Sequence, residues 1–258
     1  MPPTAPLWGV GAGCYDVAEM FAHKKGGRRM RLLRIFALCL FLHPFAHAQT
    51  PTPRTVVIPA HDGLALHGDW YWQSSSAPTV LLLHQLYSDR TGWQGLDGAF
   101  LNAGYNVLAV DLRGYGATGG RIAWRSAVRD VQAWADWARA EGNIDGGKLF
   151  MVGSSMGSVL AMVGCGNDSA CAGVVAISPG WEYYGVGVRR ALEGGLADKR
   201  VLIVYAERDR YPALGVPRML KIAPPSLRVL AFAGNAHGLD LLAQEAETLF
   251  PQLVAFMQ

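Results

Sequence analysis

The stretch Leu149-Phe150-Met151-Val152-Gly153-Ser154-Ser155-Met156-Gly157 decides the fold of this chain. It opens with an apolar run, which is typical of a strand buried on both faces of a sheet, and the residues after Ser155 favour a helix. Glycines stand two residues before and two residues after Ser155, where they allow a sharp turn and the close approach of neighbouring elements. The pattern predicts that Ser155, rather than Ser154, projects from the carboxyl end of the strand as a nucleophile; the alternative is a helix-capping serine.

Similar apolar runs recur along the chain, separated by segments with helical periodicity. We expect strands over 79–84, 106–111, 148–153, 174–178, 200–205 and 226–233, and helices over 91–104, 126–141 (with Ser126 as its cap), 156–163, 213–222 and 239–256. Strands that alternate with helices predict an α/β fold with a mostly parallel central sheet and helices on both faces. Two further strands, at 54–59 and 64–72, predict an N-terminal antiparallel hairpin at the sheet edge.

A serine hydroxyl is a weak nucleophile at neutral pH and needs a neighbouring base. Four histidines follow residue 48, namely His61, His67, His84 and His237. The first two fall in the predicted hairpin, where a surface role is the simpler interpretation, and His84 ends a strand. His237 lies between the last predicted strand and the last helix, so we expect it to be the base.

The base needs a carboxylate that orients it. Asp209 follows the predicted strand 200–205, and Glu207 is the alternative in the same loop. With Asp209 the chain order is serine, acid, histidine. The negative charge that develops on a carbonyl oxygen needs backbone N–H donors, and we expect them at Met156 and at Leu86, in the loop after His84.

These motifs together resemble the α/β-hydrolase fold family, in its small, lidless esterase and serine-aminopeptidase-like (dienelactone-hydrolase-like) branch. The motifs that carry the resemblance are Val80-Leu81-Leu82-Leu83-His84, Asp111-Leu112-Arg113-Gly114-Tyr115-Gly116, Gly153–Gly157, the surroundings of Asp209, and Asn235-Ala236-His237-Gly238. The resemblance covers about residues 54–258 and implies one catalytic domain over 49–258. It also implies that Leu86 supplies the second oxyanion donor. Gln85 stands where the family commonly has glycine, and we expect its side chain to narrow the pocket or to donate a hydrogen bond.

Family members with lids insert them after the sixth strand, where this chain has only about 20 residues between Pro179 and Arg200. We therefore expect no substantial cap domain and an open site. Tyr87, Trp181, Tyr183 and Tyr184 are candidates for lining the substrate pocket, and packing in the core or in loops is the alternative for each of them.

The N-terminal residues read as a targeting segment. Residues 30–48 combine a basic start, the apolar run 35–42 and Ala46-His47-Ala48, which is the order of a secretory signal peptide. Residues 1–29 are then a dispensable or misannotated extension, and twin-arginine export through Arg28-Arg29 is the alternative route. We expect a periplasmic or secreted protein that keeps no stable membrane insertion after cleavage.

Cysteine spacing agrees with export. Cys165 and Cys171 lie six residues apart in a loop-forming stretch, and an oxidising compartment favours a disulfide between them. Two buried free thiols are the alternative.

The charge balance favours a small-molecule substrate. The chain has 23 basic and 20 acidic residues, of which six basic and two acidic ones precede residue 49. The remaining residues therefore contain 17 basic and 18 acidic side chains, a net charge of −1. Such a body offers nucleic acid no electrostatic attraction. We expect a monomer or weak homo-oligomer, no metal and no cofactor.

The expected reaction is cleavage of carboxylic esters of small or medium acyl groups through an acyl-enzyme on Ser155. A peptidase or amidase and a non-catalytic binding protein are the alternatives.

Overall fold

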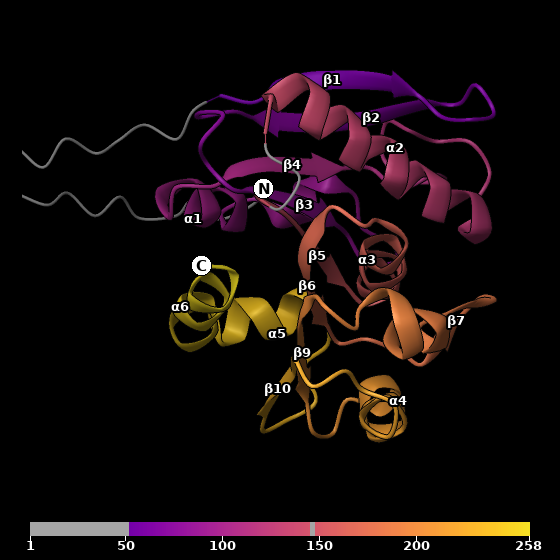
Figure 1. Cartoon of the computed structure of the whole chain (residues 1–258), viewed down its shortest axis with the longest axis vertical. Coiled ribbons are helices and arrows are strands. Elements are labelled where there is room, and N and C mark those ends of the chain that lie inside the picture. The colour runs from indigo at the N-terminus through magenta and orange to yellow at the C-terminus, as the bar shows by residue number, and fades with distance from the viewer. Residues whose placement is uncertain (1–51, 145–147) are drawn as a thin grey trace, which may run out of the picture. The chain divides into compact units, whose positions relative to one another are not determined.

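A computed structural model describes residues 52–144 and 148–258, which fall in one compact unit (Figure 1). The predicted extension 1–29 and the predicted signal peptide 30–48 lie outside the described residues. Among the described helices, none combines the length and the apolar character that crossing a bilayer requires.

One eight-stranded sheet organises the described residues, in the order β1-β2-β4-β3-β5-β6-β9-β10. Strand β2 is antiparallel to β1 and to β4, and every other neighbouring pair is parallel. The bounds are β1 (Arg54–Pro59), β2 (Ala65–Tyr71), β3 (Thr79–Leu83), β4 (Asn106–Val110), β5 (Leu149–Ser154), β6 (Cys171–Ile177), β9 (Arg200–Ala206) and β10 (Leu227–Phe232). The predicted parallel sheet with an antiparallel hairpin at one edge is confirmed.

The central strands are buried on both faces, which explains their unbroken apolar runs. Alternate residues enter two separate cores. Leu81 and Leu83 of β3 pack in one core, whereas Val80 and Leu82 pack in the other. The parallel register brings the carboxyl ends of β3, β5, β6 and β9 to the same edge of the sheet, where side chains far apart in sequence can meet.

Helices cover both faces of the sheet (Figure 1). One face carries α2 (Trp124–Gly142), α3 (Met156–Asn167) and α4 (Arg210–Leu220), and the other carries α1 (Leu96–Asn102), α5 (Leu239–Gln244) and α6 (Ala246–Met257). This three-layer arrangement is the predicted one.

Some predicted helix boundaries are wrong. The expected helix 91–104 is a short 3-10 turn, η1 (Arg90–Trp93), followed by α1, because Gly95 adopts φ 88° between them. The expected helix 239–256 is divided at Glu245 into α5 and α6. Ser126 does not cap α2, since the helix begins earlier, at Trp124.

The segment between β6 and β9 is short, as expected. It forms the hairpin of β7 (Glu182–Tyr183) and β8 (Val186–Gly187) and one helical turn, η3 (Ala191–Gly195). This segment therefore builds no cap domain.

A disulfide bond joins Cys165 to Cys171, with a Cα–Cα distance of 5.3 Å. It ties the end of α3 to the start of β6. Ser155 precedes the first residue of α3, so the disulfide lies at the other end of this helix.

Candidate active site

Ser155 itself makes the sharp turn between β5 and α3, with φ 51° and ψ −115°. L-residues rarely adopt this conformation, and it persists only where the surroundings enforce it. The backbone N–H of Ser155 donates to the carbonyl of Ile177 at 2.8 Å, which anchors the turn to β6.

The two flanking glycines serve close packing rather than the turn. A Cβ atom on Gly153 would overlap the backbone of Gly157, and one on Gly157 would overlap the carbonyl oxygen of Leu83. The start of α3 therefore lies directly against β5 and β3, and it holds Ser155 at the carboxyl edge of the sheet.

The structure brings Ser155, His237 and Asp209 together in one hydrogen-bonded chain. His237 Nε2 lies 2.7 Å from Ser155 Oγ, and His237 Nδ1 lies 2.6 Å from Asp209 Oδ2. A carboxylate can only accept, so Nδ1 carries the imidazole proton and Nε2 accepts from the serine hydroxyl. The Asp209 side chain is only 7% exposed, so its carboxylate is shielded from solvent, whereas the His237 side chain is 35% exposed. The imidazole therefore remains accessible to a substrate.

Asp209 reaches His237 from the end of the neighbouring strand. It follows β9 and precedes the first residue of α4, and its backbone N–H donates to Ala206 at 2.9 Å. Glu207, the alternative acid, is exposed. In the described part of the chain, no hydrogen bond joins the Glu207 carboxylate to His237.

Two side chains hold the loop that carries His237. The N–H of Gly238 donates to Ser178 Oγ at 2.9 Å, and the N–H of Leu239 donates to Gln85 Oε1 at 3.0 Å. Gly238 has φ 59°, and a Cβ there would overlap Gln85 Oε1. Glycine is therefore required immediately after the histidine.

Gln85 connects three loops at this edge of the sheet. Besides the N–H of Leu239, its Oε1 accepts from Ser154 Oγ at 2.9 Å. The sequence analysis expected this side chain to narrow the substrate pocket or to donate a hydrogen bond. It does line the cavity beside Ser155, but in both of these hydrogen bonds its oxygen is the acceptor. The family's usual glycine could form neither of these bonds.

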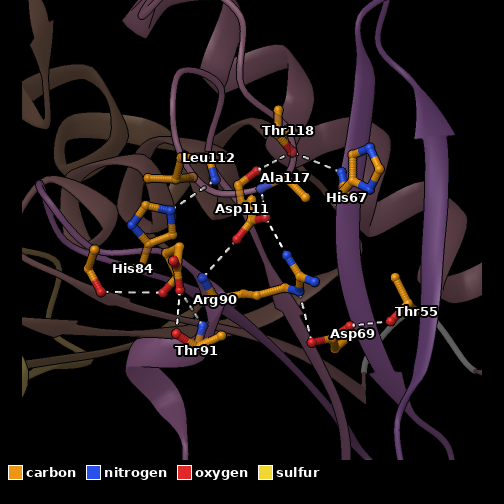
Figure 2. Close-up of polar contacts among 12 residues, drawn as sticks. Thr55, His67, Asp69, His84, Arg90, Thr91, Asp111, Leu112, Ala117 and Thr118 are labelled. Carbon is orange, nitrogen blue, oxygen red and sulfur yellow. Dashed lines mark hydrogen bonds and ion pairs between the residues drawn. The ribbon is translucent and has the colours of Figure 1, made fainter.

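His84 fixes the peptide bond that precedes Leu86. Its Nε2 accepts from the N–H of Leu112 at 3.0 Å (Figure 2), so its Nδ1–H donates to the carbonyl of Gln85 at 2.7 Å. In a planar trans peptide the N–H points opposite to the C=O, and the N–H of Leu86 therefore points away from His84. Burial, the largest cause, lowers the pKa of His84 below its ordinary value of 6.5, which favours the neutral imidazole that this pattern requires.

Charged groups hold the other end of the loop that follows β3, at Arg90 (Figure 2). Asp111 accepts from the backbone N–H of Arg90 at 2.8 Å and forms an ion pair with the Arg90 side chain, which also contacts Asp69 at 2.8 Å. Asp111 accepts in addition from the N–H of Ala117 at 2.7 Å. The first residue of the Asp111–Gly116 motif thus stabilises the loop that carries Leu86.

Met156 is the first residue of α3. The first N–H groups of a helix have no partner within the helix. The N–H of Met156 is thus available next to Ser155, as the sequence predicts for an oxyanion donor.

A cavity of about 500 Å³ opens onto Ser155 and His237. Its other lining residues come from the loop after β3, the β7–β8 hairpin and α4, namely Gln85, Leu86, Tyr87, Glu182, Tyr183, Tyr184 and Tyr211. Tyr211 was not anticipated, although its position two residues after Asp209 places it beside the site.

Trp181 does not line this cavity. It lines an adjacent one of about 400 Å³, where the Arg218 guanidinium lies 4.5 Å from the centre of its ring. Gly215 of α4 lies close to the backbone of Trp181. The indole itself contacts Arg218 of the same helix and does not line the cavity at Ser155. No group of three or more His, Cys, Asp and Glu side chains suited to a metal ion occurs within residues 52–144 and 148–258.

Comparisons with known proteins agree with this fold. Residues 74–197 match the family model of serine aminopeptidases, S33. An uncharacterized protein of Mycobacterium tuberculosis is 30% identical over 196 residues, which cover 75% of this chain and 65% of that protein; the chain thus spans about two thirds of the length of this relative.

Among solved structures, the esterase Pf2001 of Pyrococcus furiosus superposes with a TM-score of 0.69 at 20% identity, over 80% of this chain and 89% of that one. The alpha/beta hydrolase GrgF of Penicillium gives a TM-score of 0.69 at 13% identity, over 80% of this chain and 98% of that one. With the sheet order and the strand–turn–helix around Ser155, these matches show that the chain has the α/β-hydrolase fold.

Proposed function

We propose that this protein is a serine hydrolase that cleaves carboxylic esters of small or medium acyl groups through an acyl-enzyme on Ser155. The observation that carries the proposal is the hydrogen-bonded chain from Ser155 Oγ through His237 to the buried Asp209. This arrangement allows a serine hydroxyl to lose its proton as it attacks a carbonyl carbon.

The proposed reaction has two halves. In the first, Ser155 Oγ attacks the ester carbonyl and passes its proton to His237 Nε2, while Asp209 stabilises the imidazolium. The N–H groups of Leu86 and Met156 donate to the oxygen that becomes negative. His237 then returns the proton to the departing alcohol. In the second half, water releases the acyl group from Ser155 by the same steps.

The cavity supports an ester of limited size. Its volume of about 500 Å³ suits a small-molecule ligand, and its four tyrosines and Leu86 offer apolar surface to an acyl or alcohol group. The similar Pyrococcus furiosus protein is described as an esterase, which favours the same class of substrate here.

An aminopeptidase or amidase is the second candidate. The matching family model is that of serine aminopeptidases, and the Glu182 carboxylate at the cavity wall offers a partner for a substrate amine. Ester and amide substrates with the same acyl group separate the two candidates.

The decisive experiment combines labelling with turnover. A fluorophosphonate probe should label the wild-type protein and the control Ser75→Ala, an exposed serine outside the site, but not Ser155→Ala. Turnover should be measured on p-nitrophenyl esters of increasing acyl length and on aminoacyl p-nitroanilides. Labelling of Ser155→Ala would disprove the assignment of the nucleophile, and faster turnover of the anilides would favour the second candidate.

We also propose export to the periplasm or the medium. The sequence order of residues 30–48 and the Cys165–Cys171 disulfide support this, since disulfides persist mainly in oxidising compartments. N-terminal sequencing of the exported protein should begin at Gln49. A protein retained in the cytoplasm with its leader intact would contradict the proposal.

A further inference from the structure

The phenol of Tyr183 is a buried polar group without a partner beside the proposed nucleophile. Its hydroxyl is buried and makes no well-aligned hydrogen bond within the described residues, although the Ser155 hydroxyl lies near enough to lower its pKa. Within residues 52–144 and 148–258, three other buried side-chain atoms share this property, on Trp93, Tyr105 and Arg139. Of the four residues, only Tyr183 lines the cavity that contains Ser155 and His237.

The packing around Tyr183 holds its ring in place. Tyr183 pairs with Val186 in the β7–β8 hairpin, and its ring lies 5.7 Å from the ring of Tyr211 at an angle of 58°. On its other side, a Cβ on Gly180 would come within 2.7 Å of the phenol carbon that bears the hydroxyl. Glycine at 180 thus makes room for this end of the ring.

A buried hydroxyl without a partner destabilises the folded protein, and such groups call for a specific explanation. Burial, the largest cause, raises the pKa of Tyr183 to about 12, and the neighbouring Ser155 hydroxyl partly offsets this rise. The phenol is therefore a hydrogen-bond donor over the whole physiological pH range. A substrate atom that can accept a hydrogen bond would satisfy it.

The sheet order indicates which substrate atom this is. Strand β5, which leads to Ser155, lies between β3, whose loop carries Leu86, and β6, which leads to Tyr183. A carbonyl oxygen directed at the N–H of Leu86 would lie on the β3 side of Ser155. Tyr183 approaches from the β6 side, where the other ester oxygen can lie.

We propose that the Tyr183 hydroxyl donates a hydrogen bond to the alkoxy oxygen of the ester and stabilises the departing alcohol. The inference rests on the proposed hydrolase function. As the C–O bond breaks, the alkoxy oxygen gains negative charge and accepts more strongly, while His237 supplies the proton that completes the alcohol. Tyr183 keeps its own proton throughout, so the reaction balances as it does without it.

The assignment predicts an effect that depends on the leaving group. An aliphatic alkoxide is a poor leaving group and needs stabilisation, whereas p-nitrophenolate leaves readily. In Tyr183→Phe, kcat/KM for an ethyl ester should fall by about 10- to 100-fold, the range expected for loss of one hydrogen bond to a charged group. For the p-nitrophenyl ester of the same acid it should fall by less than about 3-fold. Because kcat/KM reports acylation, the shared acyl-enzyme step does not obscure the comparison.

Tyr105→Phe is a matched control. It removes another buried phenol hydroxyl that lacks a partner, at a cavity remote from Ser155 that is lined by Pro78, Lys148 and Met257 among others. Both variants should keep or raise the melting temperature, because each removes a buried polar group without a partner. Tyr105→Phe should hydrolyse both esters like the wild type.

Each outcome discriminates. Equal losses of kcat/KM on the two esters would place the hydrogen bond on the carbonyl oxygen and overturn the assignment to the leaving group. No loss on either ester, or a lowered melting temperature with losses on both, would overturn a role in the reaction. If the wild type neither reacts with fluorophosphonate nor cleaves either ester, the proposed function itself fails. If Tyr183→Phe is labelled at Ser155 yet keeps full ethyl-ester turnover, only the inference about Tyr183 fails.

Discussion

The carboxamide oxygen of Gln85 accepts a hydrogen bond of 3.0 Å from the backbone N–H of Leu239. Leu239 lies two residues after His237, and the same oxygen accepts from Ser154, the residue before Ser155. One side chain therefore sets the distance between the serine turn and the histidine loop, and it does so from the loop that carries Leu86. Catalytic groups need this kind of support, because displacements of about 1 Å lower rates strongly.

Replacing Gln85 should impair turnover without removing any reacting group. In Gln85→Ala both accepted hydrogen bonds disappear, and we expect kcat to fall about 10-fold or more with a smaller change in KM. Gln85→Glu keeps an oxygen that can accept both bonds and should recover much of the loss, whereas the exposed Gln94→Ala should behave like the wild type. Steady-state kinetics on one p-nitrophenyl ester test this, and equal activity of Gln85→Ala and the wild type would refute it.

Ser155 and His237 should act as a unit. We expect Ser155→Ala and His237→Ala each to lower kcat by on the order of 10⁴- to 10⁶-fold, and the double variant to lose no more than either alone. Circular dichroism should show folded proteins in all three cases. Additive losses would argue against a shared proton-transfer step.

The assignment of the acid can be tested by neutralising each carboxylate in turn. Asp209→Asn should lower kcat by about 10⁴-fold, since the amide no longer favours the required tautomer of His237. Glu207→Gln changes an exposed side chain and should retain activity. The reverse result would transfer the role to Glu207.

Acidification should weaken the fold through His84. Burial lowers the pKa of His84 below 6.5, so the unfolded chain binds the proton before the folded protein does. The free energy of unfolding contributed by this group is complete above about pH 6.5 and is lost as the pH falls from there through the folded-state pKa. Urea titrations at pH 7.5 and 5.5 should show a smaller pH-dependent loss in His84→Asn than in the wild type; an identical loss would contradict the assignment.

The disulfide should stabilise the fold without taking part in the reaction. Reduction of Cys165–Cys171 should lower the free energy of unfolding by about 2 kcal/mol, because the closed loop is short. Turnover at 25 °C should hardly change, since the bond lies at the end of α3 remote from Ser155. The Cys165→Ser, Cys171→Ser double variant is the control, and a reductant should not alter its stability further.

Much of the architecture was predictable because the parallel strands are buried on both faces. Such strands appear as continuous apolar runs, and the predicted ends of β1, β3 and β4 fall within one residue of the observed ones. Helix breaks were harder to predict. The division at Glu245 depends on how α5 and α6 pack on the sheet, and the sequence there contains no glycine or proline signal.

In the site, residue types with specific chemistry were easier to predict than the direction of aromatic side chains. Ser155, Asp209 and His237 follow β5, β9 and β10, which are parallel strands whose carboxyl ends lie at one edge of the sheet. Trp181 and Tyr183 are two residues apart in a segment rich in aromatic residues, and only the β7–β8 hairpin decides which of them faces Ser155. The two hydrogen bonds that Gln85 Oε1 accepts depend on where Ser154 and Leu239 lie in the folded protein. No local sequence pattern predicts those positions.

The steric roles around Ser155 have a consequence for variation of this chain. In a saturation library built on an inactive background and selected only for expression, positions 153 and 157 should still return glycine, because larger residues would overlap backbone atoms. Position 155 should behave in the opposite way and favour glycine over serine, since φ 51° with ψ −115° is strained for any residue with a Cβ. Such a selection would show that folding alone maintains the glycines at 153 and 157. The serine at 155 would then be kept for its activity, at a cost to the stability of the fold.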